Sequence, residues 1–111
     1  FGQMQTPEAL YQEAEYPGGK EALQNYFNRH LRYPTAAIDK EVVGRFTATF
    51  RVAPTGEVYE IKVLNCFDES IIKATQKAIR SMPKWLPAFS GEEPVESDVT
   101  LIFQFELHDA L

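Results

Sequence analysis

The stretch SDVTLIFQFEL, from Ser97 to Leu107, decides the fold, because apolar and polar residues alternate along it. Successive side chains of a β-strand point to opposite faces of a sheet, so this pattern predicts a strand with one apolar face. The apolar face carries Val99, Leu101, Phe103, Phe105 and Leu107, and the other face carries Thr100, Ile102, Gln104 and Glu106. We therefore expect this strand to cover a hydrophobic core, which leaves the question of what lies along its outer edge.

Two earlier segments, 42–52 and 57–65, are predicted to form a hairpin. Both alternate in the same way, and the turn residues APTG (Ala53–Gly56) lie between them. A four-residue loop that places Val52 opposite Glu57 keeps both apolar sides on one face, whereas a slip of one residue would reverse every side chain. The further pairs predicted by this register are Phe50 with Tyr59, Ala48 with Ile61 and Phe46 with Val63.

Three segments are predicted to be helical. Residues 19–31 carry apolar side chains at three- and four-residue spacing, and Pro34–Lys40 begins with a proline that suits a first helical turn. The segment 68–82 begins at Asp68, a good N-cap, and ends before Pro83. Its predicted buried stripe consists of Ile71, Thr75, Ala78, Ile79 and Met82.

The remaining segments are predicted to be irregular. Residues 1–15 are polar with scattered apolar side chains and are interpreted as a linker or tail, and SGEEP (residues 90–94) is interpreted as a loop. Trp85, in an extended segment after the last helix, is large enough to seal one end of the core.

The order helix, strand, strand, helix, strand predicts an α+β fold: a two-layer sandwich in which two helices cover one face of a three-stranded antiparallel sheet. The helix between the second and third strands allows the third to lie beside the first, which gives the order 2-1-3. Segment 97–107 then lies at an edge of the sheet, where an extended peptide could add as a strand. Two alternatives are that residues 1–15 cover this edge and that it pairs with a second copy of the chain.

Composition excludes several classes of function. The formal charge of −5 makes nucleic acid an unsuitable partner, and no cysteine–histidine spacing suggests a metal site. The single cysteine, Cys66, is expected to be a buried thiol, and the two histidines have no sequence neighbour that would form a catalytic dyad. We therefore expect neither an enzyme nor a bound cofactor.

Several motifs occur together in an order that resembles a known family. The runs are LRYPTAAIDKEVVGRFTATFRVAPTGEVYEIKVLN (31–65), AIRSMPKWLPA (78–88) and GEEPVESDVTLIFQFEL (91–107). The matching positions are Tyr33, Pro34, Gly44, Pro54, Gly56, Trp85 and Pro87. Residues 16–111 are on this basis similar to the C-terminal domain of TonB energy transducers, with the YPGG turn and the helix 19–31 resembling a subgroup that has an extra N-terminal helix.

The resemblance implies a periplasmic domain of a protein anchored in the inner membrane. Such domains capture the N-terminal TonB box of outer-membrane receptors by strand addition. They transmit energy from a proton-driven motor complex of the inner membrane and perform no chemistry. The membrane helix and the proline-rich linker of the family are absent from this sequence. That departure leaves a second interpretation open, a structural or sensor module of a membrane signalling protein that self-associates or regulates.

The predicted peptide-binding residues follow from the edge strand and from the resemblance. The strand contributes Ser97, Asp98, Val99, Thr100, Leu101, Ile102, Phe103 and Gln104. Ile102 is a candidate side-chain contact because it is apolar on the otherwise polar face. By family analogy, Arg32 and Tyr33 are expected to add a polar contact.

Overall fold

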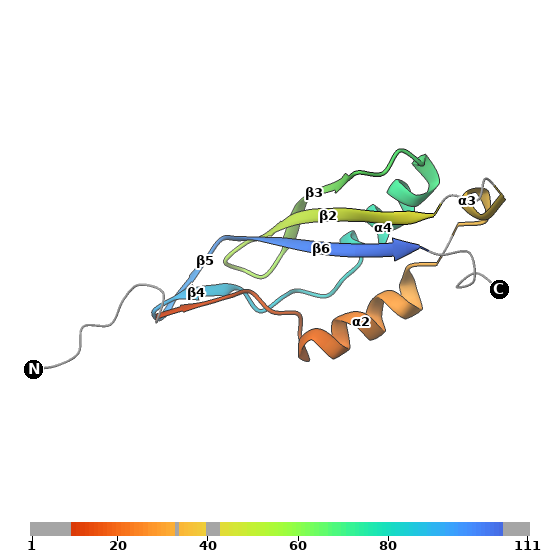
Figure 1. The fold of residues 1–111 in the computed structure, drawn as a ribbon. Coiled ribbons are helices and arrows are strands. Elements are labelled where there is room, and N and C mark those ends of the chain that lie inside the picture. The colour runs from red at the N-terminus through yellow and green to blue at the C-terminus, as the bar shows by residue number, and fades with distance from the viewer. Residues whose placement is uncertain (1–9, 33, 40–42, 106–111) are drawn as a thin grey trace, which may run out of the picture.

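The computed structural model describes residues 10–32, 34–39 and 43–105, and within these ranges it contains three helices and two small sheets (Figure 1). The elements in chain order are β1 (Tyr11–Gln12), α2 (Gly19–His30), α3 (Thr35–Asp39), β2 (Gly44–Val52), β3 (Val58–Leu64), α4 (Glu69–Arg80), β4 (Ala88–Ser90), β5 (Glu93–Val95) and β6 (Ser97–Phe105). None of these helices is long and apolar enough to cross a membrane.

The main sheet has the order β3-β2-β6, and both outer strands are antiparallel to β2. The predicted α+β class and the strand order 2-1-3 are therefore confirmed. β6 pairs with β2 without interruption, from Ser97 opposite Val52 to Phe105 opposite Gly44. β6 is thus an edge strand of this sheet within the described residues.

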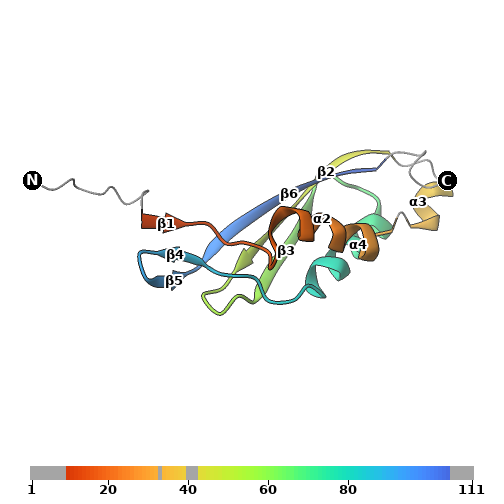
Figure 2. The ribbon, with the colours of Figure 1, turned by 90° about the horizontal axis from the view of Figure 1, so that it is seen from below.

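The core lies on the face of the sheet that α2 and α4 cover (Figures 1 and 2). Phe46, Ala48, Phe50 and Val52 of β2 are buried there, as their two-residue spacing predicted. The Tyr26 hydroxyl of α2 donates a hydrogen bond of 2.7 Å to the Ala78 carbonyl of α4, which ties the two helices together.

The helix signals in the sequence are largely confirmed. Asp68 accepts a hydrogen bond from the Ile71 backbone N–H at 3.1 Å, which satisfies one of the free donors at the start of α4. Four residues of the predicted stripe are buried, namely Ile71, Thr75, Ala78 and Ile79, and Met82 packs against the core. Pro34 lies just before α3, whose Ala37 packs in a second small cluster with Phe46 and Ile71.

The predicted register of the hairpin is wrong. Val58, not Glu57, lies opposite Val52, and Tyr59 lies opposite Arg51. The loop is one residue longer than expected, and a β-bulge then shifts the pairing again, so that Val63 faces Ala48. Glu60 lies at the bulge with φ 52°, a left-handed conformation that no local pattern announced. The bulge restores the apolar side chains of β3 to the core face.

The second sheet, of order β1-β4-β5, was not predicted. The supposed loop at residues 90–94 is a hairpin in which Gly91, with φ 65°, lies in the tight turn between β4 and β5. Part of the supposed tail also pairs: Tyr11 lies opposite Ser90, and Glu15 exchanges backbone hydrogen bonds of 2.9 and 2.8 Å with Leu86. β5 leads directly into β6, so one continuous extended segment joins the two sheets (Figure 1). Residues 1–9 lie outside the described residues.

Candidate functional site

The backbone of β6 presents one side to β2 and the other to an edge of the sheet with which no described residue forms a strand pair, which we call the free edge. Ala53 donates its N–H to the Glu57 carbonyl across the hairpin (2.8 Å), so β2 residues at odd positions direct their backbone groups toward β3. Even-numbered residues of β2 then face β6, and the one-to-one register gives the matching positions in β6. Val99 and Leu101 therefore face β2, whereas Asp98, Thr100 and Ile102 direct their N–H and C=O groups toward the free edge.

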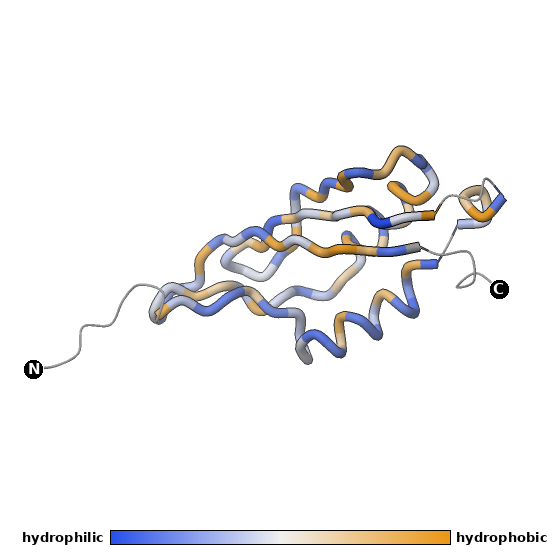
Figure 3. Tube along the Cα trace, in the orientation of Figure 1, coloured by the Kyte–Doolittle hydropathy of each residue, from blue (hydrophilic) through white to orange (hydrophobic). Residues whose placement is uncertain are grey.

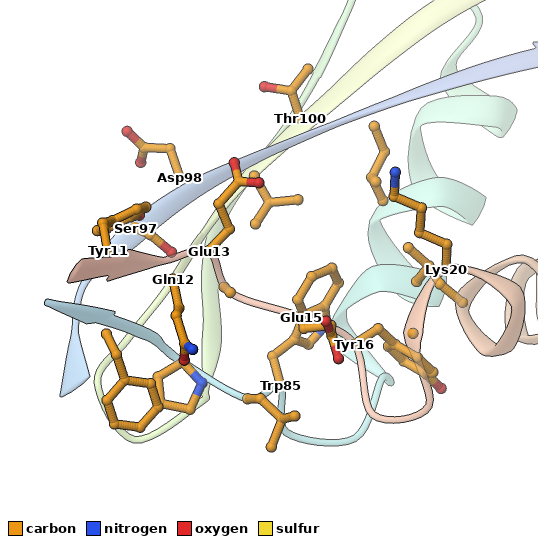
Figure 4. Close-up of a pocket in the computed structure, with 18 residues that line it drawn as sticks. Tyr11, Gln12, Glu13, Glu15, Tyr16, Lys20, Trp85, Ser97, Asp98 and Thr100 are labelled. Carbon is orange, nitrogen blue, oxygen red and sulfur yellow. The ribbon is translucent and has the colours of Figure 1, made fainter. Parts of the chain in front are cut away.

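A groove of about 880 Å³ runs along this free edge (Figure 4). One side is β6 from Ser97 to Leu101, and the opposite wall is the segment Tyr11–Tyr16 with the start of α2. Trp85–Pro87 and Phe89 line it between these two sides. The volume lies in the range of roughly 300–1,000 Å³ that is typical of ligand sites.

The wall is positioned by aromatic packing and by a glycine turn. Tyr16 is buried, and its ring meets the rings of Trp85 and Tyr26 at centroid distances of 5.8 and 5.9 Å. Gly18, with φ 94°, then turns the chain into α2. The sequence YPGG (Tyr16–Gly19) therefore forms the turn between the extended part of the wall and α2.

Trp85 is held by the hairpin between β2 and β3. Its backbone N–H donates a hydrogen bond of 2.9 Å to the Gly56 carbonyl, and its ring packs edge-on against the Phe50 ring at a centroid distance of 5.3 Å. Gly56 has φ 94°, and a Cβ there would lie 2.2 Å from the Trp85 carbonyl oxygen, so only glycine fits. The predicted role of Trp85 in closing the core agrees with its 5% exposure.

Acidic side chains dominate the charge of the groove. Glu13, Glu15 and Asp98 line it together with one base, Lys20. Asp98 also pairs with Arg51 on the outer face of the sheet, where the Arg51 guanidinium lies 3.1 Å from Asp98 and 2.7 Å from Glu96. These two exposed ion pairs contribute little stability but fix the start of β6 beside β2.

The structure brings together only part of the predicted site. Residues Ser97–Leu101 line the groove, and Ile102, which is 66% exposed, lies beyond it on the outer face. Further along β6, Phe103 packs in the core, and Gln104 is exposed and accepts a hydrogen bond from Arg45 at 3.5 Å. Arg32 is exposed after α2 and does not line the groove. Tyr33 lies outside the described residues.

Sequence reasoning missed the opposite wall. Ala14 is half-buried and Tyr16 is buried, while Glu13 and Glu15 between and before them are exposed, which is the alternation of an extended segment. This signal was present in LYQEAEY, but it spans too few residues to be distinguished from a polar tail.

Among the described residues, no group of three or more histidine, cysteine or acidic side chains could hold a metal ion. Burial, with a smaller contribution from Tyr16, raises the pKa of Tyr26 above its ordinary value, but Tyr26 lies in the core and not in the groove. A free strand edge beside a groove is typical of domains that bind extended peptides.

Fold and groove together define a small α+β interaction domain with an open strand edge. The family model of the Gram-negative bacterial TonB protein C-terminal matches residues 29–107. The chain therefore belongs to the family of TonB C-terminal domains, as its motifs predicted. These are non-catalytic protein-interaction domains.

Solved structures of this family are similar to the chain. The solution structure of the Pseudomonas aeruginosa TonB C-terminal domain is 24% identical, with 67% of this chain and 75% of that chain covered and a TM-score of 0.51. Two solution structures of the Helicobacter pylori TonB C-terminal domain are 24% and 23% identical. They cover 78% and 81% of this chain and 91% and 87% of their own, with TM-scores of 0.46 and 0.49. No curated protein matches the chain.

Proposed function

We propose that this domain captures the N-terminal TonB box of outer-membrane receptors in the periplasm by adding it as a strand to β6. In the full-length protein, an inner-membrane anchor and a proton-driven motor complex would supply the force that the domain transmits for nutrient uptake. The single observation that carries the proposal is the outer edge of β6 from Ser97 to Ile102, with which no residue that the structure describes forms a strand pair, beside a groove of peptide size. Family membership supports the class of partner.

Backbone pairing alone would give weak binding. A five-residue guest strand opposite Ser97–Leu101 gains about four hydrogen bonds, from the outward N–H and C=O groups of Asp98 and Thr100, each worth roughly 0.5–1.5 kcal/mol net. Association costs an estimated ~4–15 kcal/mol, so side-chain contacts have to supply the remainder. The half-buried Leu23, Val99 and Leu101 offer apolar surface along the groove for alternate guest side chains.

An NMR titration tests the proposal directly. Synthetic peptides that copy receptor N-terminal segments are added to the labelled 111-residue chain, and amide shifts are mapped. We expect the largest shifts in Ser97–Phe105 and in the wall around Tyr11–Tyr16. The control is each peptide with a central proline, which cannot donate at that position. Shifts confined to Val58–Leu64, or equal binding of the proline peptides, would overturn strand addition at β6.

A further inference from the structure

The groove has two walls of different origin. The family match begins at residue 29, whereas the wall opposite β6 is built from Tyr11–Tyr16, Gly19, Lys20 and Leu23. This wall therefore lies ahead of the part of the chain that the family model describes. A guest strand on β6 would lie between the family sheet and a segment that the match does not include.

Two acidic side chains of this wall line the groove. Glu13 and Glu15 both line the groove, and neither forms an ion pair with any residue that the structure describes. In Figure 4, the Glu13 side chain extends from the wall toward β6 and ends, in this view, between Asp98 and Thr100, whereas Lys20 projects from the start of α2. A guest that covers Glu13 removes water from its carboxylate, which is costly unless the guest brings an opposite charge.

Two buried polar atoms in the same groove also lack partners. The Trp85 indole nitrogen and the Ser97 hydroxyl are shielded from water and have no hydrogen-bond partner in the described chain. Trp85 is 5% exposed, and buried polar groups of this kind are nearly always paired in folded proteins. Because neither atom is exposed to solvent, neither is available to a guest in the groove of this folded chain, so selection of the guest rests on the charges that line the groove.

We infer that the wall formed by Tyr11–Lys20 selects its guest: an extended peptide with a lysine or arginine side chain that meets Glu13, opposite the Asp98–Thr100 part of β6. The inference rests on the proposed strand addition and specifies the chemistry of the peptide. β6 provides main-chain pairing that a peptide of any sequence can use. The Glu13 carboxylate, in contrast, raises the affinity for a peptide with a basic side chain at this position and lowers it for one with an acidic side chain.

A peptide set with one variable position tests this selection. Nine-residue peptides of alternating threonine and valine carry lysine, glutamine or glutamate at each position in turn, and affinities are measured by NMR titration on β6 amides. For the best position, we expect the lysine peptide to bind roughly threefold to tenfold more tightly than the glutamate peptide. The preference should weaken as salt rises.

Charge reversal on the protein identifies the residue responsible. In Glu13→Lys, we expect the lysine preference to be lost or reversed, while the glutamine peptide still shifts β6 amides. The matched control is Glu92→Lys, because Glu92 is an exposed acid of the β4–β5 turn that does not line the groove. An unchanged preference in Glu13→Lys, or an equal loss in Glu92→Lys, would overturn the inference while strand addition stands. If no peptide shifts β6 amides, strand addition itself fails.

Discussion

The two outer strands of the main sheet, β3 and β6, pair with the same central strand but present different kinds of outer edge. β3 is interrupted by a bulge at Glu60 and carries Glu60 and Lys62 as exposed charges. β6 pairs residue by residue along its whole length, and its middle, from Val99 to Phe103, carries no charge, proline or bulge. In Figure 3, hydrophobic colour is continuous along the middle of β6 and broken along β3.

This difference indicates which edge is available to a partner. An exposed edge invites pairing with other chains, and proteins usually block it with charge, proline or a bulge. β3 has two of these features, and β6 has none in its middle. The open edge also lies beside the groove, so a guest on β6 finds side-chain surface that backbone pairing alone would lack.

The largest predicted effect is loss of the core that both edges share. Phe50 is 1% exposed and packs against Trp85, so Phe50→Ala should lower the free energy of unfolding by about 3–5 kcal/mol. Urea unfolding followed by the fluorescence of the single tryptophan measures it. Ile102→Ala, at an exposed position of the same sheet, should change stability by less than about 0.5 kcal/mol. Similar losses in both variants would contradict the assignment of the core face.

A smaller loss is expected where the hairpin meets Trp85. Gly56→Ala places an alanine in a left-handed backbone conformation and brings its Cβ into a clash with the Trp85 carbonyl oxygen. We therefore expect the free energy of unfolding to fall by at least about 2 kcal/mol. Gly91→Ala is the matched control, because Gly91 also has positive φ but nothing within 4 Å of the added Cβ, and about 1 kcal/mol is expected there. Thermal unfolding of both variants distinguishes close packing from backbone strain. Equal losses would mean that the contact with Trp85 has no energetic weight.

The contrast between the edges could be predicted only in part from sequence. The long alternation of Ser97–Phe105 placed β6, its apolar face and its edge position correctly, because a sustained period of two has few other interpretations. The bulge at Glu60 could not be predicted, since the left-handed conformation of a glutamate is imposed by tertiary packing and not by local preference.

The groove was predictable on one side only. Ser97–Leu101 followed from the edge strand, whereas β1, β4 and β5 span two or three residues each and are too short to show a period. The pairing of β1 with β4 joins segments that are distant in sequence, as does the nearby contact between Tyr16 and Trp85, so both form only in the folded chain. The binding roles of all the predicted residues, including Arg32, stay predictions.

The free edge of β6 can be blocked without breaking the sheet. Thr100 directs its N–H outward, so Thr100→Pro should weaken binding of receptor peptides by roughly threefold to tenfold through one lost hydrogen bond, while the fold persists. Leu101→Pro, one residue further, removes a donor that faces β2 and should instead destabilise the domain. Peptide titration with circular dichroism measures both properties. If Thr100→Pro unfolds the chain and Leu101→Pro does not, the assignment of outward positions is reversed.

The smallest effect is expected at the contact that fixes α2, the helix of the groove wall. Tyr26→Phe removes the hydrogen bond to the Ala78 carbonyl and should cost about 0.5–1.5 kcal/mol at neutral pH, measured by urea unfolding.

The pH dependence of this contact has a definite sign. Burial raises the pKa of Tyr26 above its value of 10.0 in an unfolded chain, so the folded state holds the phenolic proton more tightly. The stability that this provides is present below pH 10 and is lost as pH rises through the folded pKa. The wild-type advantage over Tyr26→Phe should therefore shrink above about pH 10. A constant difference from neutral to alkaline pH would show that packing of the ring, and not the buried hydroxyl, holds α2 opposite the open edge.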